Sequence, residues 1–202
     1  MRLIGMLDSP YVRRVAISLK LIGLDFAHEP LSVFSTYDAF AAVNPVVKAP
    51  TLVTDEGIVL MDSSLILEHA ERLVPPERRL APADFAAHTR ALRIVGLALA
   101  ACEKSVQIIY EHNLRPAEKQ HAPWLDRVRG QMQAAFRLLE AEVAGADPWL
   151  FENRPLQADI CAAVAWRFTS ETLPGAVSGA PALAALSARA EATAAFSAYP
   201  YS

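Results

Sequence analysis

The first 73 residues alternate between strand-like and helix-like patterns of hydrophobic positions. Arg2 to Met6 is a short apolar run typical of a strand, and residues 10–22 place apolar side chains at helical spacing. Further patterns predict a strand over 26–30, a short helix over 34–42, a hairpin of strands 51–54 and 58–61, and a helix over 63–73. The order βαβ, short helix, ββ, helix predicts a mixed sheet with parallel and antiparallel strands.

Beyond this region the pattern is almost entirely helical. A proline-broken, charged stretch at 74–82 is interpreted as an interdomain linker. Long helices are predicted over 83–113, 124–143 and 157–172, followed by one or two short helices over 182–195. We therefore expect two domains, an α/β domain over residues 1–75 and an all-α domain over residues 83–202.

Composition excludes several classes of protein. The 202 residues are 53% hydrophobic and 20% charged, with a net charge of -3. This balance is too apolar for a disordered chain and lacks the basic excess that neutralises nucleic-acid phosphates. No apolar run approaches the roughly 20 residues of a membrane span, and Asp8 comes too early for a signal peptide. We therefore expect a cytoplasmic protein that binds neither nucleic acid nor membrane.

The two cysteines, Cys102 and Cys161, form no CxxC pair and lack the spacing of metal ligands. Both fall in helical stretches rich in Ala and Val, where buried, inert thiols are expected. No metal site is predicted.

Ser9 and Pro10 follow the first predicted strand and open the first helix. Ser is a preferred N-cap and Pro is favoured at the first helical position, so a structural role alone explains the pair. The same geometry places a hydroxyl beside the positive end of the helix dipole, where it can stabilise an anion. No His and acid stand near Ser9 in sequence, so we expect a hydrogen-bond donor rather than an activated nucleophile.

Two further motifs flank the predicted hairpin. Lys48-Ala49-Pro50 precedes it, and from the residues alone a trans peptide bond is favoured there. Asp62-Ser63 follows it at the start of a helix, where both residues are candidate N-caps. A Ser at this place can also bind a carboxylate, and Asp62 can accept a hydrogen bond from an ammonium group. For Asp62-Ser63, neither the capping nor the binding interpretation is decisive alone.

Together the three motifs fall in order within a βαβ–ββα half that precedes a helical half. In this arrangement the whole chain resembles the cytosolic glutathione S-transferases, most closely the bacterial serine-type members whose first helix begins S-P-Y-V-R-R-V. Asn44-Pro45, Lys48-Ala49-Pro50-Thr51-Leu52 and Asp62-Ser63 match that family's N-P pair, cis-proline loop and glutathione-binding acid-Ser pair. The resemblance implies a thioredoxin-like N-terminal domain and a helical-bundle C-terminal domain.

The resemblance also implies roles for the matched residues. Ser9 would hydrogen-bond the glutathione sulfur as the catalytic residue. The backbone of Ala49, in a cis Ala49–Pro50 turn, would pair with the cysteinyl backbone of glutathione. Asp62 and Ser63 would hold the γ-glutamyl end.

Three further residues are implied with less specific roles. Lys48 or Phe34 would contact the glycyl end of glutathione, and Tyr110 would line a second-substrate pocket between the domains. The implied reaction is attack of the glutathione thiolate on a small hydrophobic electrophile, as in detoxification. The resemblance implies a homodimer, with glutathione as a substrate and no metal or organic cofactor.

The chain departs from the family pattern at two places. Many members carry Glu where Asp62 stands, and Asp reaches less far. The family's capping box on the sixth helix, Ser/Thr-x-x-Asp, reads Leu156-Gln157-Ala158-Asp159 here. The acid is kept and the hydroxyl is lost, at a cost of about 0.5–2 kcal/mol.

Arg13 and Arg14 are expected as solvated charges on a helix face, although they could add positive potential near the thiolate.

Two alternatives remain open at this stage. A glutathione-transferase-like binding or regulatory protein without turnover would share the fold, because a fold does not determine a function. A thiol–disulfide oxidoreductase is a more distant alternative, because no cysteine stands at or near Ser9. The residues do not distinguish conjugation from peroxidase activity or another thiol transfer.

Overall fold

The computed structural model describes residues 1–202, which divide into two compact units. The first unit comprises Met1–Leu80 together with Ala192–Ser202, and the second comprises Ala81–Glu191. The helical pattern predicts residues 192–202 as part of the second domain, and this boundary is wrong, because in the structure they belong to the first unit.

A four-stranded mixed sheet organises the first unit, in the order β2-β1-β3-β4. Its strands are β1 (Arg2–Ile4), β2 (Ala27–Glu29), β3 (Thr51–Val53) and β4 (Val59–Met61). β1 and β2 are parallel, whereas β3 pairs antiparallel with β1 and with β4. The predicted mixture is confirmed, because a crossover helix joins the parallel pair and a short turn joins β3 to β4.

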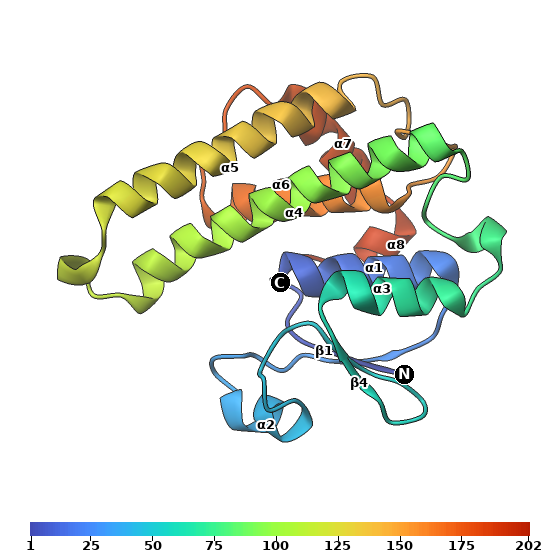
Figure 1. Cartoon of the computed structure of the whole chain (residues 1–202), viewed down its shortest axis with the longest axis horizontal. Helices are drawn as coiled ribbons and strands as arrows, with labels where there is room; N and C mark the ends of the chain where they lie inside the picture. The colour runs from blue at the N-terminus through green and yellow to red at the C-terminus, as the bar shows by residue number, and fades with distance from the viewer. The chain divides into compact units, whose positions relative to one another are not determined.

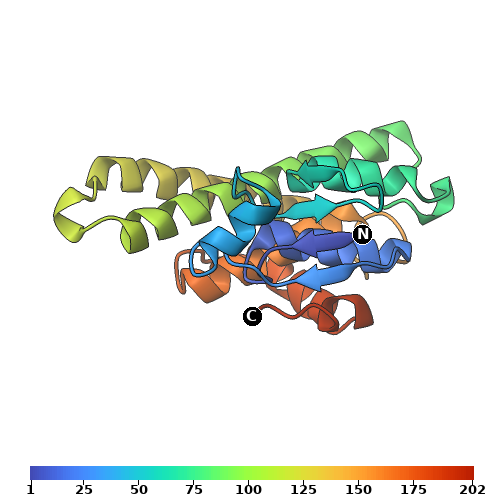
Figure 2. The ribbon, with the colours of Figure 1, turned by 90° about the horizontal axis from the view of Figure 1, so that it is seen from below.

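Helices cover both faces of this sheet. Figures 1 and 2 show α1 (Pro10–Ile22) and α3 (Ser63–Arg72) on one face and α2 (Tyr37–Val43) on the other. A 3-10 helix over Pro76–Arg78 follows α3. α1 ends at Gly23, whose φ of 74° is the left-handed conformation that commonly terminates helices. The result is the thioredoxin-like arrangement that the family resemblance implies.

The C-terminal segment of the chain packs on α1 of the first unit through α8 (Ala194–Ser197). Phe196 is buried there, and the Arg13 guanidinium lies 5.6 Å from the centroid of its ring. Tyr199 stacks on Phe26 with ring centroids 5.4 Å apart. These contacts explain why the segment belongs to the first unit, although its sequence pattern is simply helical.

The second unit is helical, as predicted. It contains α4 (Phe85–Leu114), α5 (Ala122–Val143), α6 (Gln157–Thr172) and α7 (Pro181–Glu191), with a 3-10 helix over Ala117–Lys119. The long helices α4 and α5 lie side by side, and α6 packs against α4 and α7 (Figure 1). Both cysteines are buried in this unit, as expected. No helix in the structure has both the length and the hydropathy that crossing a membrane requires.

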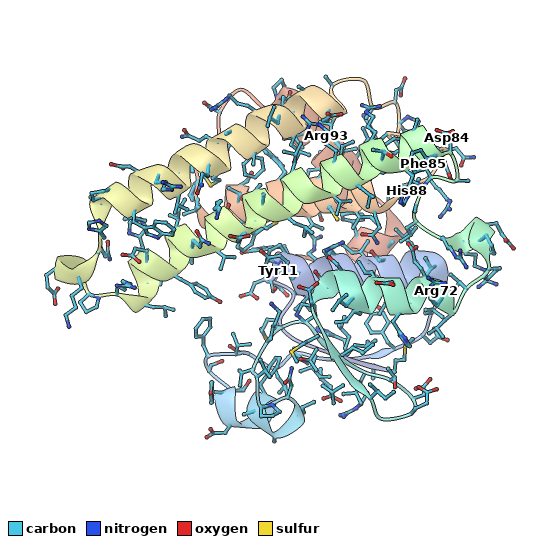
Figure 3. All side chains as sticks on the ribbon, in the orientation of Figure 1. Tyr11, Arg72, Asp84, Phe85, His88 and Arg93 are labelled. Carbon is cyan, nitrogen blue, oxygen red and sulfur yellow. The ribbon has the colours of Figure 1, made fainter.

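The first turns of α4 and α6 are held by acids. Asp84 caps α4, since its Oδ1 accepts a hydrogen bond from the Ala87 backbone at 2.8 Å; Figure 3 labels it at this end of the helix. Asp159 is fully buried in α6, and its two carboxylate oxygens accept from the backbone nitrogens of Leu150 and Leu156, each at 2.9 Å. Burial raises the pKa of the Asp159 carboxyl, although these backbone hydrogen bonds act in the opposite direction.

Candidate functional site

The three sequence motifs adjoin strand ends that lie at the same edge of the sheet. Ile4, the last residue of β1, pairs with Thr51 at the start of β3, and Thr51 pairs with Met61 at the end of β4. The loop that leads to Ser9, the proline before β3 and the acid after β4 adjoin these paired residues in sequence. The strand register therefore brings together motifs that are separated along the chain.

Gly5 allows the loop after β1 to approach its neighbours closely. Its φ is 141°, and a Cβ on this residue would lie 2.5 Å from Val12 Cγ2 and 3.3 Å from the Cβ of Ala49. A side chain at this position is therefore excluded by both backbone conformation and space. The Gly5 carbonyl accepts a hydrogen bond from His28 Nε2 at 2.8 Å, which ties the loop to β2. The loop is thus held against α1 and against the proline loop.

Ser9 is the N-cap of α1, as predicted, and its side chain is half-buried. Its Oγ accepts from the backbone nitrogen of Val12 over a long distance of 3.4 Å. The hydroxyl hydrogen is not used in this bond, so it stays available to an acceptor near the positive end of α1. Partial desolvation raises the pKa of the neighbouring Asp8 carboxyl, against the lowering effect of backbone hydrogen bonds.

The loop before β3 is fixed by an internal hydrogen-bond network. The Ala49–Pro50 peptide bond is cis, which confirms the conformation implied by the family resemblance. The buried Asn44 donates from Nδ2 to Thr51 Oγ1 at 2.8 Å, and the Thr51 hydroxyl donates to the Lys48 carbonyl at 2.8 Å. Asn44 therefore shapes the loop, whereas the Lys48 side chain is exposed.

Asp62 and Ser63 lie at the start of α3. Asp62 has a φ of 72°, a conformation that residues other than glycine rarely adopt. Residues held in such conformations cluster at functional sites. Asp62 Oδ1 accepts from the Ser64 backbone at 2.9 Å and so caps the helix. Its second carboxylate oxygen keeps its capacity to accept from another group. The acid can therefore cap α3 and bind a cation at the same time.

Arg14 lies behind this acid-Ser pair. The residue is only 4% exposed, and its NH1 donates to Ser63 Oγ at 3.0 Å and to Ser64 Oγ at 3.3 Å. The expectation that Arg13 and Arg14 are solvated helix-face charges is wrong, because all residues from 12 to 19 are buried in the structure. One feature of the sequence could have indicated this burial: residues 12–19 contain no charged residue besides the two arginines.

Two further residues to which the family resemblance gives a role, Phe34 and Tyr110, lie on other elements. Phe34 precedes α2 and is 55% exposed, and Tyr110 on α4 of the second unit is 43% exposed. In the first unit, the strand register brings together Ser9, the proline loop and the acid-Ser pair, and the hydrogen bond to Ser63 adds Arg14.

Comparison with known proteins places these features in a family. Residues 3–78 match the family model of the glutathione S-transferase N-terminal domain, and residues 122–189 match that of the C-terminal domain. The chain is 31% identical over 140 residues to the uncharacterized GST-like protein YibF of Escherichia coli, covering 69% of this chain and 68% of that protein. It is 28% identical over 154 residues to maleylacetoacetate isomerase of Pseudomonas aeruginosa, covering 73% and 71% respectively.

Solved structures resemble the chain along its whole length. A glutathione S-transferase from Methylobacterium radiotolerans, in complex with glutathione sulfonate, has a TM-score of 0.89 and 30% identity, covering 100% of this chain and 95% of that one. A glutathione transferase family member from Pseudomonas fluorescens with bound glutathione has a TM-score of 0.83 and 30% identity, covering 98% and 97%. With both domains matched and the fold shared, this chain belongs to the glutathione S-transferase family.

Proposed function

We propose that this protein binds glutathione and transfers the whole glutathionyl group, through its thiol sulfur, to a small hydrophobic electrophile, as a serine-type transferase of the bacterial kind. The observation that carries the proposal is the gathering of Ser9, the cis Ala49–Pro50 loop and Asp62-Ser63 at one edge of the sheet. The structure from Pseudomonas fluorescens carries bound glutathione and aligns with 98% of this chain at 30% identity, which supports the choice of ligand.

The acid-Ser pair is suited to the zwitterionic end of glutathione. Asp62 accepts from the γ-glutamyl ammonium with the carboxylate oxygen that does not cap α3. The Ser63 hydroxyl donates to the α-carboxylate beside the positive end of α3, where an anion is stabilised. The backbone of Ala49 pairs with the cysteinyl residue, and Lys48 or Phe34 contacts the glycyl end.

In this proposal Ser9 donates a hydrogen bond to the glutathione sulfur and stabilises its thiolate. A free thiol has a pKa of about 8.5, and a hydrogen-bond donor at a helix N-terminus lowers it toward neutrality. The thiolate then attacks the electrophilic carbon, forming a C–S bond while the leaving group departs with the electron pair of the broken bond. Tyr110 contacts the electrophile. No metal or organic cofactor takes part, because the thiol is supplied by glutathione itself.

A homodimer in the cytoplasm completes the proposal. Phe85 and Leu92 on α4 are 83% and 58% exposed, which supports an apolar contact with a second copy of the chain. Sedimentation as a monomer at micromolar concentration would contradict this part.

Isomerisation is a second candidate, because one relative is a maleylacetoacetate isomerase. Addition of the thiolate to a conjugated cis double bond converts that bond to a single bond about which the carbon skeleton rotates. Expulsion of the thiolate then restores the double bond in the trans form and regenerates glutathione. The same Ser9 and the same glutathione contacts would serve this reaction.

The test is binding followed by two assays of turnover. We expect retention of the protein on immobilised glutathione, and conjugation of glutathione to an aryl halide electrophile that is slowed in Ser9→Ala. Isomerisation of a cis-unsaturated diketo acid without net consumption of glutathione would support the second candidate. Retention without either activity would favour a binding or regulatory protein, and no binding of glutathione in solution would overturn the proposal.

A further inference from the structure

Arg14 connects α1 to the glutathione-binding end of α3. The two helices pack together, and Figure 3 labels Tyr11 near the start of α1 and Arg72 at the end of α3, at opposite ends of the pair. Both helices therefore begin at the same end, which brings the second turn of α1 beside the first turn of α3. The backbone of Arg14 is itself held, because the buried Ser18 donates from Oγ to its carbonyl at 2.6 Å.

We propose that Arg14 is a positioning residue that makes the acid-Ser pair selective for the α-carboxylate of the γ-glutamyl group. The inference rests on the proposed binding of glutathione at this site. It divides recognition of the zwitterion between two charges, with Arg14 acting on the carboxylate through Ser63 and Asp62 acting on the ammonium.

The direction of the hydrogen bond between Arg14 and Ser63 determines what the Ser63 hydroxyl can bind. A guanidinium only donates, so Ser63 Oγ must accept from Arg14 NH1, at 3.0 Å. The hydroxyl hydrogen of Ser63 therefore cannot be directed at Arg14 and remains to be donated elsewhere. An incoming carboxylate, which only accepts, is the complementary partner. An ammonium group is not, because it only donates.

The buried positive charge of Arg14 also favours a carboxylate at Ser63. Arg14 and Ser63 are each only 4% exposed, so water screens the guanidinium weakly. A hydroxyl that accepts from a cation is polarised and donates more strongly, since hydrogen bonds in a chain reinforce one another. The positive charge behind Ser63 also attracts an anion and repels a cation. Both effects favour the carboxylate.

Arg13 provides a matched control on the same helix. It is also a buried arginine, 1% exposed, but its Nε donates to the Tyr199 carbonyl and its guanidinium lies over the ring of Phe196. Replacement of either arginine by methionine removes one buried charge from α1. Only the Arg14 change removes the donor to Ser63.

The experiment measures dissociation constants by calorimetry for three ligands and five proteins. The ligands are glutathione, its analogue without the α-carboxylate (4-aminobutyryl-cysteinyl-glycine) and its analogue without the amino group (glutaryl-cysteinyl-glycine). The proteins are the wild type, Arg14→Met, Arg14→Lys, Arg13→Met and Asp62→Asn. A hydrogen bond to a charged group predicts that Arg14→Met weakens glutathione and the glutaryl analogue about tenfold to a hundredfold.

The remaining pairs of protein and ligand test whether the effect of Arg14 is specific to the α-carboxylate. The affinity of Arg14→Met for the 4-aminobutyryl analogue should change less than about threefold, a difference well below the value of one charge-assisted hydrogen bond. Arg14→Lys keeps the charge and should recover part of the loss for both carboxylate ligands. Arg13→Met should unfold more easily while keeping the wild-type ratio of the three affinities. Asp62→Asn should weaken glutathione and the 4-aminobutyryl analogue and spare the glutaryl analogue.

An equal loss for all three ligands in Arg14→Met would overturn the inference, because it would indicate general damage to the site. Unchanged affinity for glutathione would overturn it as well. If Arg14→Met does not fold, Arg14→Lys must show the same dependence on the α-carboxylate at smaller amplitude, and an equal loss there has the same meaning. Absence of glutathione binding by the folded wild type would overturn the proposed function itself, which is a distinguishable result.

Discussion

Arg13 Nε donates to the carbonyl of Tyr199 at 2.9 Å, although the two residues are 186 positions apart in the chain. This bond fastens the C-terminal segment to the first helix. It is reinforced by the position of the guanidinium over Phe196 and by the stacking of Tyr199 on Phe26. The N-terminal unit is therefore complete only when the end of the chain has folded onto it.

Arg13→Met should lower the free energy of unfolding by about 2–4 kcal/mol, because it removes a hydrogen bond to a charged donor and a cation–π contact. Urea unfolding followed by circular dichroism measures this change. Arg2→Met is the control, since the Arg2–Glu29 ion pair is exposed to solvent and should contribute at most about 1 kcal/mol. Equal effects of the two substitutions would contradict the role of Arg13.

Ser9→Ala should raise the pKa of the glutathione thiol in the complex by about one to two units, because one charge-assisted hydrogen bond to the thiolate is lost. Conjugation should slow, whereas glutathione affinity should change little. Thiolate absorbance against pH measures the shift. The substitution also removes the N-cap of α1, so Asp84→Ala, which removes the N-cap of α4, is the matched control. It should lower stability by about 1 kcal/mol without moving the thiol pKa.

Ser63→Ala and Asp62→Ala should weaken glutathione binding rather than its activation, because both residues serve groups remote from the sulfur. Loss of a hydrogen bond to a charged group predicts a weakening of about 1.5–3 kcal/mol for Ser63→Ala. Calorimetry measures the affinity, and the thiol pKa of the saturated complexes should stay at the wild-type value. Unchanged affinity in both variants would remove these residues from the site.

Asp159→Ala should lower the free energy of unfolding by about 2–4 kcal/mol, because it leaves the backbone N–H groups of Leu150 and Leu156 without their acceptor. Chemical denaturation measures the change. Glu152→Ala is a suitable control in the same region, since Glu152 forms a partly exposed ion pair with Arg154. A loss below about 1 kcal/mol in Asp159→Ala would contradict the importance of the two bonds.

The pH dependence of Asp159 has a definite sign. Its pKa is raised in the folded protein, so the folded state binds the proton more tightly than the unfolded state does. The protonated carboxyl therefore contributes stability that is full below 3.8, the ordinary pKa of an aspartate carboxyl, and is lost as pH rises through the raised pKa. Asp159→Asn cannot ionise, so its destabilisation relative to wild type should be largest at low pH and should shrink as pH rises. A difference that grows with pH would contradict this assignment.

The sequence by itself determined the local structure of this protein. The start and end of α1 follow from Ser9, Pro10 and Gly23, whose capping and backbone preferences act within a few residues. The order of strands and helices follows from hydrophobic periodicity, and the motifs that flank the hairpin follow from residue type and spacing. These features are predictable because each depends on neighbours in the chain.

Only the tertiary structure decided the environment of the two α1 arginines and the placement of the C-terminal segment. Arg14 meets Ser63 from 49 positions away, and Arg13 meets Tyr199 from 186 positions away. Helical periodicity treats both arginines as surface charges, because it records the spacing of side chains and not which other elements pack around the helix. Burial of a guanidinium is acceptable only where distant groups accept its hydrogen bonds, and those acceptors come together only when the chain has folded.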